Sequence, residues 1–156
     1  AEAGVNLDFF SNYILPIPTK EFQIHTKFNS NIGVLKMYPG ITENAVRAIT
    51  ESKVDAIVLE SFGSGNTTTA DWFIACLQEA ISSDKIIVDI SQCNGGSVQL
   101  GKYETSRKLQ KMGVLSGYDM TFEATVTKLM YLMGKGLALD EIKKIMEISI
   151  AGELTN

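Results

Sequence analysis

One stretch of the sequence, residues 56–66, restricts the fold more than any other. It reads AIVLESFGSGN, so four apolar residues run directly into a turn that contains two glycines. A helical pattern begins soon afterwards, at Asp71. An uninterrupted apolar strand followed by a glycine turn and a helix is typical of a parallel sheet that is covered on both faces. Because ligands bind beyond the carboxyl ends of such strands, we expect any working surface at residues 61–66 and in the loops beside them.

Strands and helices alternate along the rest of the chain. Strands are expected at residues 32–37, 54–60, 85–90 and 114–115, and helices at 43–50, 71–81, 104–112, 121–133 and 140–149. Residues suited to cap these helices are Thr42, one of the threonines at 67–69, Thr121 and Asp140. This order predicts an α/β fold with a small parallel sheet of about four strands, right-handed crossovers and helices on both faces.

Composition excludes several classes of protein. With 156 residues and 45% apolar content, the chain fits one ordinary domain, and its net charge of −4 argues against a nucleic-acid surface. No apolar run approaches the roughly 20 residues that span a membrane. The two cysteines, Cys76 and Cys93, are interpreted as reduced thiols in a cytoplasmic protein. No signal peptide is visible at the start, and the first residue, Ala1, indicates a fragment.

Residues 1–31 are interpreted as a tether that precedes a domain at residues 32–156. This segment carries apolar anchors between prolines and polar residues, namely Phe9, Phe10, Tyr13, Ile14, Leu15 and Phe22. A free tail rarely carries so many aromatic residues. We therefore expect part of the tether to pack on the domain or on a partner.

The glycine turn resembles a phosphate-binding loop only weakly. The sequence Gly63-Ser64-Gly65-Asn66 lacks the third glycine of the dinucleotide motif, since Thr68 stands there, and no Gly-Lys-Ser/Thr follows. A tight strand-to-helix turn is the simpler interpretation. The amide of Asn66 nevertheless offers donors and an acceptor at this edge of the sheet.

The chain contains no complete catalytic set. A threonine hydroxyl at residues 67–69 would need an adjacent base, and the only histidine, His25, lies in the tether. No clustering of ligand residues predicts a metal site, and no cofactor motif is present. Two residues stay open: Cys93 either packs in its loop or lines a ligand pocket, and Asp119 either faces a ligand or serves the start of the following helix.

Six segments, taken in order, resemble the C-terminal domain of type I, cytoplasmic-type bacterial L-asparaginases. They are residues 34–41, 57–66, 91–93, 113–121, 123–129 and 152–155. The likeness covers about residues 32–155, and Ala3-Gly4-Val5 resembles the interdomain linker of that family. The resemblance implies a flavodoxin-like or Rossmann-like layering. It also implies hydrolysis of L-asparagine to L-aspartate and ammonia through a threonine acyl-enzyme.

In that family the catalytic threonines, lysine and aspartate lie in an N-terminal domain, within motifs of the kinds TGGT and HGTD. Neither motif occurs here, so the resemblance implies that this chain alone is inactive and has its own N-terminal domain as a partner. Active sites of the family lie between subunits, which implies a homodimer or homotetramer. The family's loop asparagine, which reaches a neighbouring subunit's site, corresponds to Asn66.

Some type I members also bind asparagine at a regulatory site, which here corresponds to residues around Glu60, Ser61 and Cys93. Where such members carry a basic residue, this chain has Glu60. A carboxylate at that position repels the α-carboxylate of asparagine, which argues against regulation by asparagine here.

Two alternatives remain beside the asparaginase hypothesis. The chain could come from the asparaginase-like subunit of an amidotransferase that acts on glutamyl-tRNA. It could also be a stand-alone module that binds a small ligand or a partner without catalysis. The sequence upstream of Ala1 would decide between these possibilities.

Overall fold

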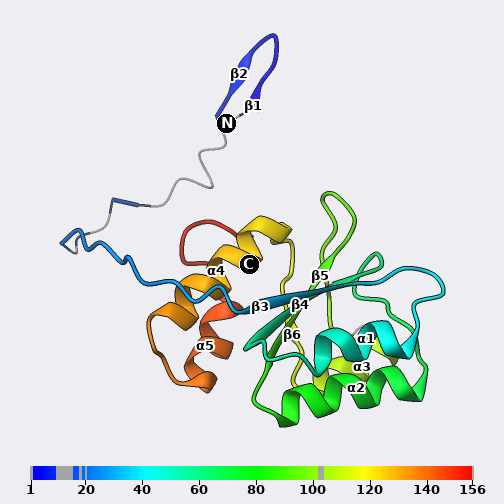
Figure 1. Ribbon diagram of the computed structural model, residues 1–156. Helices are drawn as coiled ribbons and strands as arrows, with labels where there is room; N and C mark the ends of the chain where they lie inside the picture. The colour runs from blue at the N-terminus through cyan, green and yellow to red at the C-terminus, as the bar shows by residue number, and fades with distance from the viewer. Residues whose placement is uncertain (1, 10–15, 18, 20, 102–103, 156) are drawn as a thin grey trace.

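The computed structural model describes residues 2–9, 16–17, 19, 21–101 and 104–155. Its main sheet has four parallel strands, as expected from the sequence, and their order in the sheet is β3-β4-β5-β6 (Figure 1). They are β3 (Ile32–Lys36), β4 (Ala56–Ser61), β5 (Ile86–Ser91) and β6 (Leu115–Ser116). Two shorter strands, β1 (Glu2–Ala3) and β2 (Leu7–Asp8), form an antiparallel pair.

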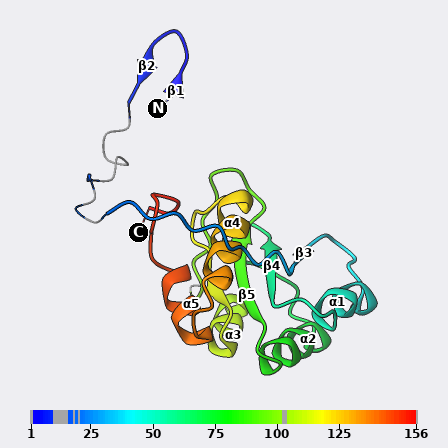
Figure 2. The ribbon, with the colours of Figure 1, turned by 60° about the vertical axis from the view of Figure 1, so that its left-hand side comes forward.

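Helices cover both faces of this sheet, which confirms the predicted layering. They are α1 (Glu43–Thr50), α2 (Asp71–Ser82), α3 (Glu104–Met112), α4 (Phe122–Gly134) and α5 (Leu139–Met146). The helices α1, α2 and α3 lie on one face, and α4 and α5 lie on the other (Figures 1 and 2). Right-handed crossovers between strands that follow chain order send all connecting helices to the same face. The other face is therefore left to the helices that follow β6.

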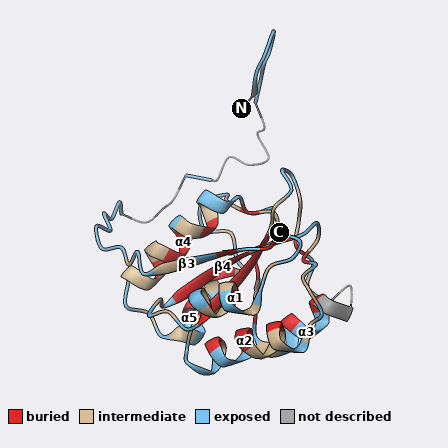
Figure 3. Ribbon diagram, turned by 45° about the vertical axis from the view of Figure 1, so that its right-hand side comes forward, coloured by how far each residue is buried: buried red, intermediate tan, exposed pale blue. Residues whose placement is uncertain are grey.

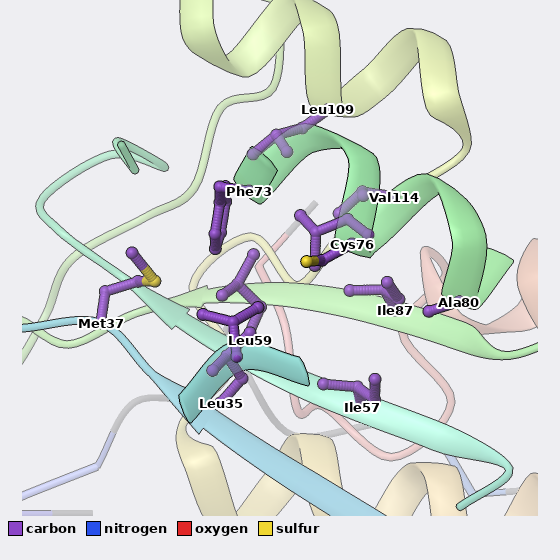
Figure 4. Packing of buried hydrophobic residues seen from close by; sticks show 12 residues of the cluster. Leu35, Met37, Ile57, Leu59, Phe73, Cys76, Ala80, Ile87, Leu109 and Val114 are labelled. Atoms are coloured by element: carbon purple, nitrogen blue, oxygen red, sulfur yellow. The ribbon is translucent and has the colours of Figure 1, made fainter. Parts of the chain in front are cut away.

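Side chains of the central strands alternate between two cores. Ile57, Leu59 and Ile87 pack with apolar residues of α1, α2 and α3, as Figure 4 shows. Val58 and Val88 pack instead with residues of α4 and α5. Figure 3 shows the interior of the main sheet buried, whereas the edge strand β3 and much of the outer helical surface are more exposed. Both cores therefore depend on the same two strands.

Two helices begin as the sequence predicts. The Thr42 hydroxyl accepts a hydrogen bond from the backbone N–H of Ala45 at 3.4 Å, at the start of α1. The Thr121 hydroxyl accepts from the N–H of Ala124 at 3.2 Å, at the start of α4. In both, a side chain satisfies one of the N–H groups that the first helical turn leaves unpaired.

Two capping predictions are wrong. The residue before α2 is Ala70, and none of the three threonines caps the helix; the Thr68 hydroxyl accepts instead from the N–H of Ala70 at 3.3 Å. The residue before α5 is Ala138, and Asp140 lies inside the first turn. At that position its charge favours the helix through the positive N-terminal end of the dipole rather than through a hydrogen bond.

Part of the N-terminal segment packs on α4. The backbone N–H of Asn29 donates to the carbonyl oxygen of Met130 at 3.0 Å, and the His25 ring lies edge-on to Tyr131 with centroids 5.6 Å apart. Phe9 and Phe22 are exposed. The other expected anchors, Phe10, Tyr13, Ile14 and Leu15, lie outside the described residues. The domain boundary at residue 31 stays a prediction.

The buried Lys128 of α4 holds the C-terminal segment against the domain. Its ammonium donates to the carbonyl oxygens of Met146 at 3.0 Å and Ile148 at 2.6 Å, and it pairs with the carboxylate of Glu153 at 2.6 Å. The side chains of Lys128 and Glu153 are 3% and 12% exposed. Burial raises the pKa of Glu153, but Lys128 and the backbone hydrogen bonds of Ala151, Glu153 and Ile150 outweigh burial and lower it to about 2.

The side chain of Gln92 ties the carboxyl ends of the strands together. Its amide donates to the carbonyl oxygen of Met37 at 2.6 Å and to that of Glu60 at 2.7 Å. Its backbone N–H donates to the carbonyl of Ser61 at 3.0 Å. One residue after β5 therefore fixes the ends of both β3 and β4, on which the neighbouring loops depend.

The substitution Lys128→Met would keep the apolar stem and leave the Glu153 carboxylate without its cation. We expect the free energy of unfolding to fall by about 3 to 5 kcal/mol, as for other broken buried ion pairs. Urea denaturation at pH 7 measures this loss. The double variant Lys128→Met/Glu153→Gln should recover part of it, because the unpaired charge is also removed. Equal stability of the single variant and the wild type would contradict this role.

The substitution Gln92→Glu tests the hydrogen bonds by which the side chain of Gln92 joins the ends of β3 and β4. At pH 7 a carboxylate would face two carbonyl oxygens, and we expect stability to fall by about 2 to 3 kcal/mol. The loss should shrink below about pH 5, because a protonated glutamate can donate one of the bonds. The matched control is Gln99→Glu on an exposed side chain, which should leave urea denaturation nearly unchanged. A loss that is equal in both variants would rule out the proposed tie.

Candidate functional site

The loops that follow the strands meet at one edge of the sheet and enclose a cavity of about 370 Å³. Its walls come from the end of β4, from the loop after β5 and from the segment that leads into α4. The lining residues are Glu60, Ser91, Gln92, Cys93, Asn94, Gly95, Gly96, Asp119, Met120, Thr121, Phe122 and Glu123. The sequence predicts a working surface at residues 61–66 and in the loops beside them; the cavity lies among those neighbouring loops, and none of residues 61–66 is in its lining.

Among the described residues, the charged side chains that line the cavity are Glu60, Asp119 and Glu123, and all three are acidic. Glu60 is 14% exposed, and its carboxylate lies 3.3 Å from the ammonium of Lys36, whose side chain is 61% exposed and solvated. That solvated cation offsets the charge of Glu60 only weakly. The cavity therefore disfavours an anionic group and favours a neutral or cationic one.

The three residues assigned to a regulatory site by resemblance do not all meet there. Glu60 and Cys93 line the cavity, and the thiol of Cys93 is free and exposed. Ser61 is buried on the opposite face of β4, where its hydroxyl donates to the carbonyl oxygen of Ile90 at 3.3 Å. Cys93 thus lines a cavity, and its contact with a ligand stays a prediction. Cys76 is buried in the core, as expected.

Asp119 makes a contact that differs from both roles considered from the sequence, which were to face a ligand or to serve the start of α4. Its carboxylate accepts hydrogen bonds from the backbone N–H of Thr155 at 3.1 Å and from the Thr155 hydroxyl. Burial raises the pKa of Asp119, but the bonds from Thr155 outweigh burial and hold the pKa below its usual range. The residue thus anchors the end of the chain while it lines the cavity. Sequence reasoning missed this contact because the partners are 36 residues apart.

The turn at residues 63–66 is a tight, hydrogen-bonded loop, as expected. The N–H of Phe62 donates to the carbonyl of Asn66, and the N–H of Asn66 donates back to the carbonyl of Phe62, each at 2.9 Å. The Ser91 hydroxyl donates to the carbonyl of Gly63 at 2.6 Å. The backbone of Asn66 is therefore fixed, while the residue itself is exposed at the edge of the sheet.

A further residue, Asp89, was not singled out from the sequence. It lies in β5 and is fully buried, and neither carboxyl oxygen has a hydrogen-bond partner among the residues that the structure describes. Burial raises its pKa to about 7, and the nearby hydroxyl of Ser61 offsets part of that rise. The one signal in the sequence is an acidic residue inside the apolar run KIIVDI.

Within the described residues, no group of three or more His, Cys, Asp or Glu side chains is arranged to hold a metal ion. The same residues include no helix that is long and apolar enough to cross a membrane. The hydroxyls of the threonine run take part in local contacts: Thr67 donates to the carbonyl of Thr68 at 3.3 Å. None of these contacts supplies a base that would activate a nucleophile.

Known proteins resemble this chain over nearly all of its length. The model of the glutaminase/asparaginase C-terminal domain matches residues 31–146. L-asparaginase 1 of Escherichia coli (strain K12) is 38% identical over 154 residues, which cover 99% of this chain and 46% of that protein. A component of the glutamyl-tRNA(Gln) amidotransferase of Pyrococcus abyssi is 32% identical over 136 residues, with coverage of 87% and 31%.

A solved structure supports the same relationship. The crystal structure of L-asparaginase I from Vibrio cholerae O1 biovar eltor str. N16961 matches with a TM-score of 0.89 and 37% identity, and covers 99% of this chain and 47% of that one. The chain spans less than half the length of each of these relatives. It belongs to the glutaminase/asparaginase C-terminal domain family.

Proposed function

We propose that this chain is the C-terminal domain of an L-asparaginase, which hydrolyses L-asparagine to L-aspartate and ammonia in the cytoplasm. The observation that carries the proposal is the match to L-asparaginase I along 99% of the chain, with a TM-score of 0.89. The nucleophilic threonine and its activating groups are expected in the other half of the protein. The domain supports assembly into a homodimer or homotetramer and completes the substrate pocket of a neighbouring subunit.

Asn66 is the residue that we assign to that neighbouring pocket. Its backbone is held in place by the pair of hydrogen bonds with Phe62, while the residue is exposed beyond the carboxyl end of β4. An amide presented on a fixed backbone can hydrogen-bond a polar substrate with little loss of conformational entropy. Its donors and acceptor suit the amino and carboxylate groups of an amino acid.

The amidotransferase alternative receives less support. The relative of that class is less similar than L-asparaginase 1, with 32% against 38% identity and a shorter matched length. Ammonia release by the full-length protein from free asparagine, without tRNA, supports the asparaginase. Release that depends on glutamyl-tRNA would instead identify the amidotransferase.

The substitution Asn66→Ala in the full-length protein should lower turnover of asparagine by about 10- to 100-fold, the effect of losing one hydrogen bond to a charged substrate group. Ammonia release measures turnover, and thermal denaturation should show an unchanged midpoint. The control Asn44→Ala removes an exposed amide from α1 and should change neither. An unchanged rate for Asn66→Ala would remove this residue from the site. Ammonia release by the isolated chain would contradict the proposal as a whole.

The acidic cavity bears on regulation by asparagine. Because Glu60, Asp119 and Glu123 all face it, we propose that it does not hold the α-carboxylate of an amino acid. The regulatory role suggested by resemblance is then lost in this protein, although the cavity persists. Lys36 lies outside the lining and is largely solvated, so it does not replace the missing cation.

Calorimetry with the full-length protein, in a background that lacks turnover, tests this idea. Asparagine should show no binding at the cavity of the wild type, whereas Glu60→Arg should gain binding by at least about tenfold, because one repulsive charge becomes attractive. The control Glu141→Arg makes the same change of charge on an exposed residue of α5 and should gain nothing. Equal binding by the wild type and Glu60→Arg would refute the role of Glu60.

A further inference from the structure

The buried carboxyl of Asp89 lies in the middle strand pair of the sheet and takes no part in the site described above. It faces the side of the sheet that α2 and α3 cover, together with Ser61, since residues in register on neighbouring strands and two apart share a face. Burial of a carboxyl group without hydrogen bonds is strongly unfavourable, and far more so when the group is ionised. Such a residue is a candidate for a functional role.

The glycine turn forms the cover over this carboxyl. Gly65 is buried with a φ of +105°, and a Cβ atom placed on it would lie 3.3 Å from Oδ2 of Asp89 and 3.2 Å from Cγ1 of Val98. A side chain at Gly65 would therefore crowd the carboxyl oxygen, and the glycine lets the turn pass close to it. Asn66, the next residue, is held by its two bonds to Phe62. A displacement of Gly65 would therefore also displace Asn66.

The surroundings of this carboxyl carry no compensating charge within the described part of the chain. Burial is the main cause of its raised pKa, and only the Ser61 hydroxyl acts against it. The described groups around it on this face are the Ser61 hydroxyl of β4, Gly65 of the turn and Ser116 of β6, its register partner. The helices that cover the face, α2 and α3, contribute the buried residues Phe73, Cys76, Leu77, Ala80, Ser106 and Leu109. Burial raises the pKa of the Cys76 thiol, so none of these described groups supplies a charge, and the carboxyl stays neutral by keeping its proton.

We propose that Asp89 is a proton-dependent positioning residue: its neutral carboxyl seats the turn at residues 63–66, and loss of the proton lifts the turn and displaces Asn66. The inference rests on the proposed function for its consequence in catalysis. A buried ionised carboxylate is unfavourable unless water can hydrate it. The turn is the part of its surroundings that can move aside and admit that water. The strands are held by continuous ladders, whereas the turn tip is tied to its neighbours by bonds from the Ser91 hydroxyl and from the N–H of Gln99.

Hydrogen exchange of the full-length protein, followed by mass spectrometry and corrected for intrinsic rates, tests the movement. The peptide that contains residues 62–70 should lose about tenfold in protection between pH 6 and pH 8, since the opened population rises as Asp89 ionises with a pKa of about 7. Asp89→Asn should abolish this dependence. Gly65→Ala should give weak protection at both pH values, because its Cβ would press on the carboxyl. A peptide from α5 serves as the internal control.

Turnover tests the consequence for Asn66. The ratio of wild-type to Asp89→Asn turnover should fall about tenfold over the same range, and taking the ratio cancels all other titrations. Protection of the wild-type turn that does not change with pH, a result that needs no variant, would overturn the proposal. An equal pH dependence in Asp89→Asn would overturn it as well. Changing protection with a constant turnover ratio would support proton-dependent seating and contradict the catalytic role of Asn66.

Discussion

The parallel pairing of β5 with both β4 and β6 is the constraint on which the rest of the structure depends. Each of the first five residues of β5 is buried, so its side chains can only face one of the two cores. Its parallel neighbours end at the same edge, which gathers the loops around one cavity. The same burial removes Asp89 from water. Core, cavity and buried carboxyl are therefore consequences of one strand.

The parts of the fold that follow from local pattern could be predicted from the sequence. Apolar runs located the strands, and α1 and α3 have the predicted bounds because their periodicity is local. Contacts between distant residues could not be found in this way. Gln92 bonds to Met37 across 55 positions, and Asp119 bonds to Thr155 across 36. The sequence around a polar residue does not reveal which distant residue will become its hydrogen-bond partner in the folded chain.

Only part of the candidate site could be predicted from the sequence. The turn and Asn66 stood out because glycines after an apolar strand have a local meaning. The acidic charge of the cavity did not stand out, because Glu60 is far in the sequence from Asp119 and Glu123 and only folding brings the three carboxylates to one cavity. Ser61 shows the limit of reasoning by position alone. It neighbours Glu60 in sequence, but alternation along β4 places it on the opposite face.

Asp89 and Glu153 make stability depend on pH in opposite directions. The pKa of Glu153 is lowered from 4.5 to about 2, so its contribution is present above about pH 4.5 and is lost as the pH falls through 2. The pKa of Asp89 is raised from 3.8 to about 7, so its contribution is present below about pH 4 and is lost as the pH rises through 7. Between about pH 2 and pH 7, Glu153 is ionised and paired with Lys128, while Asp89 keeps its proton beneath Gly65. The C-terminal ion pair and the seated turn are thus compatible only on the acid side of neutrality.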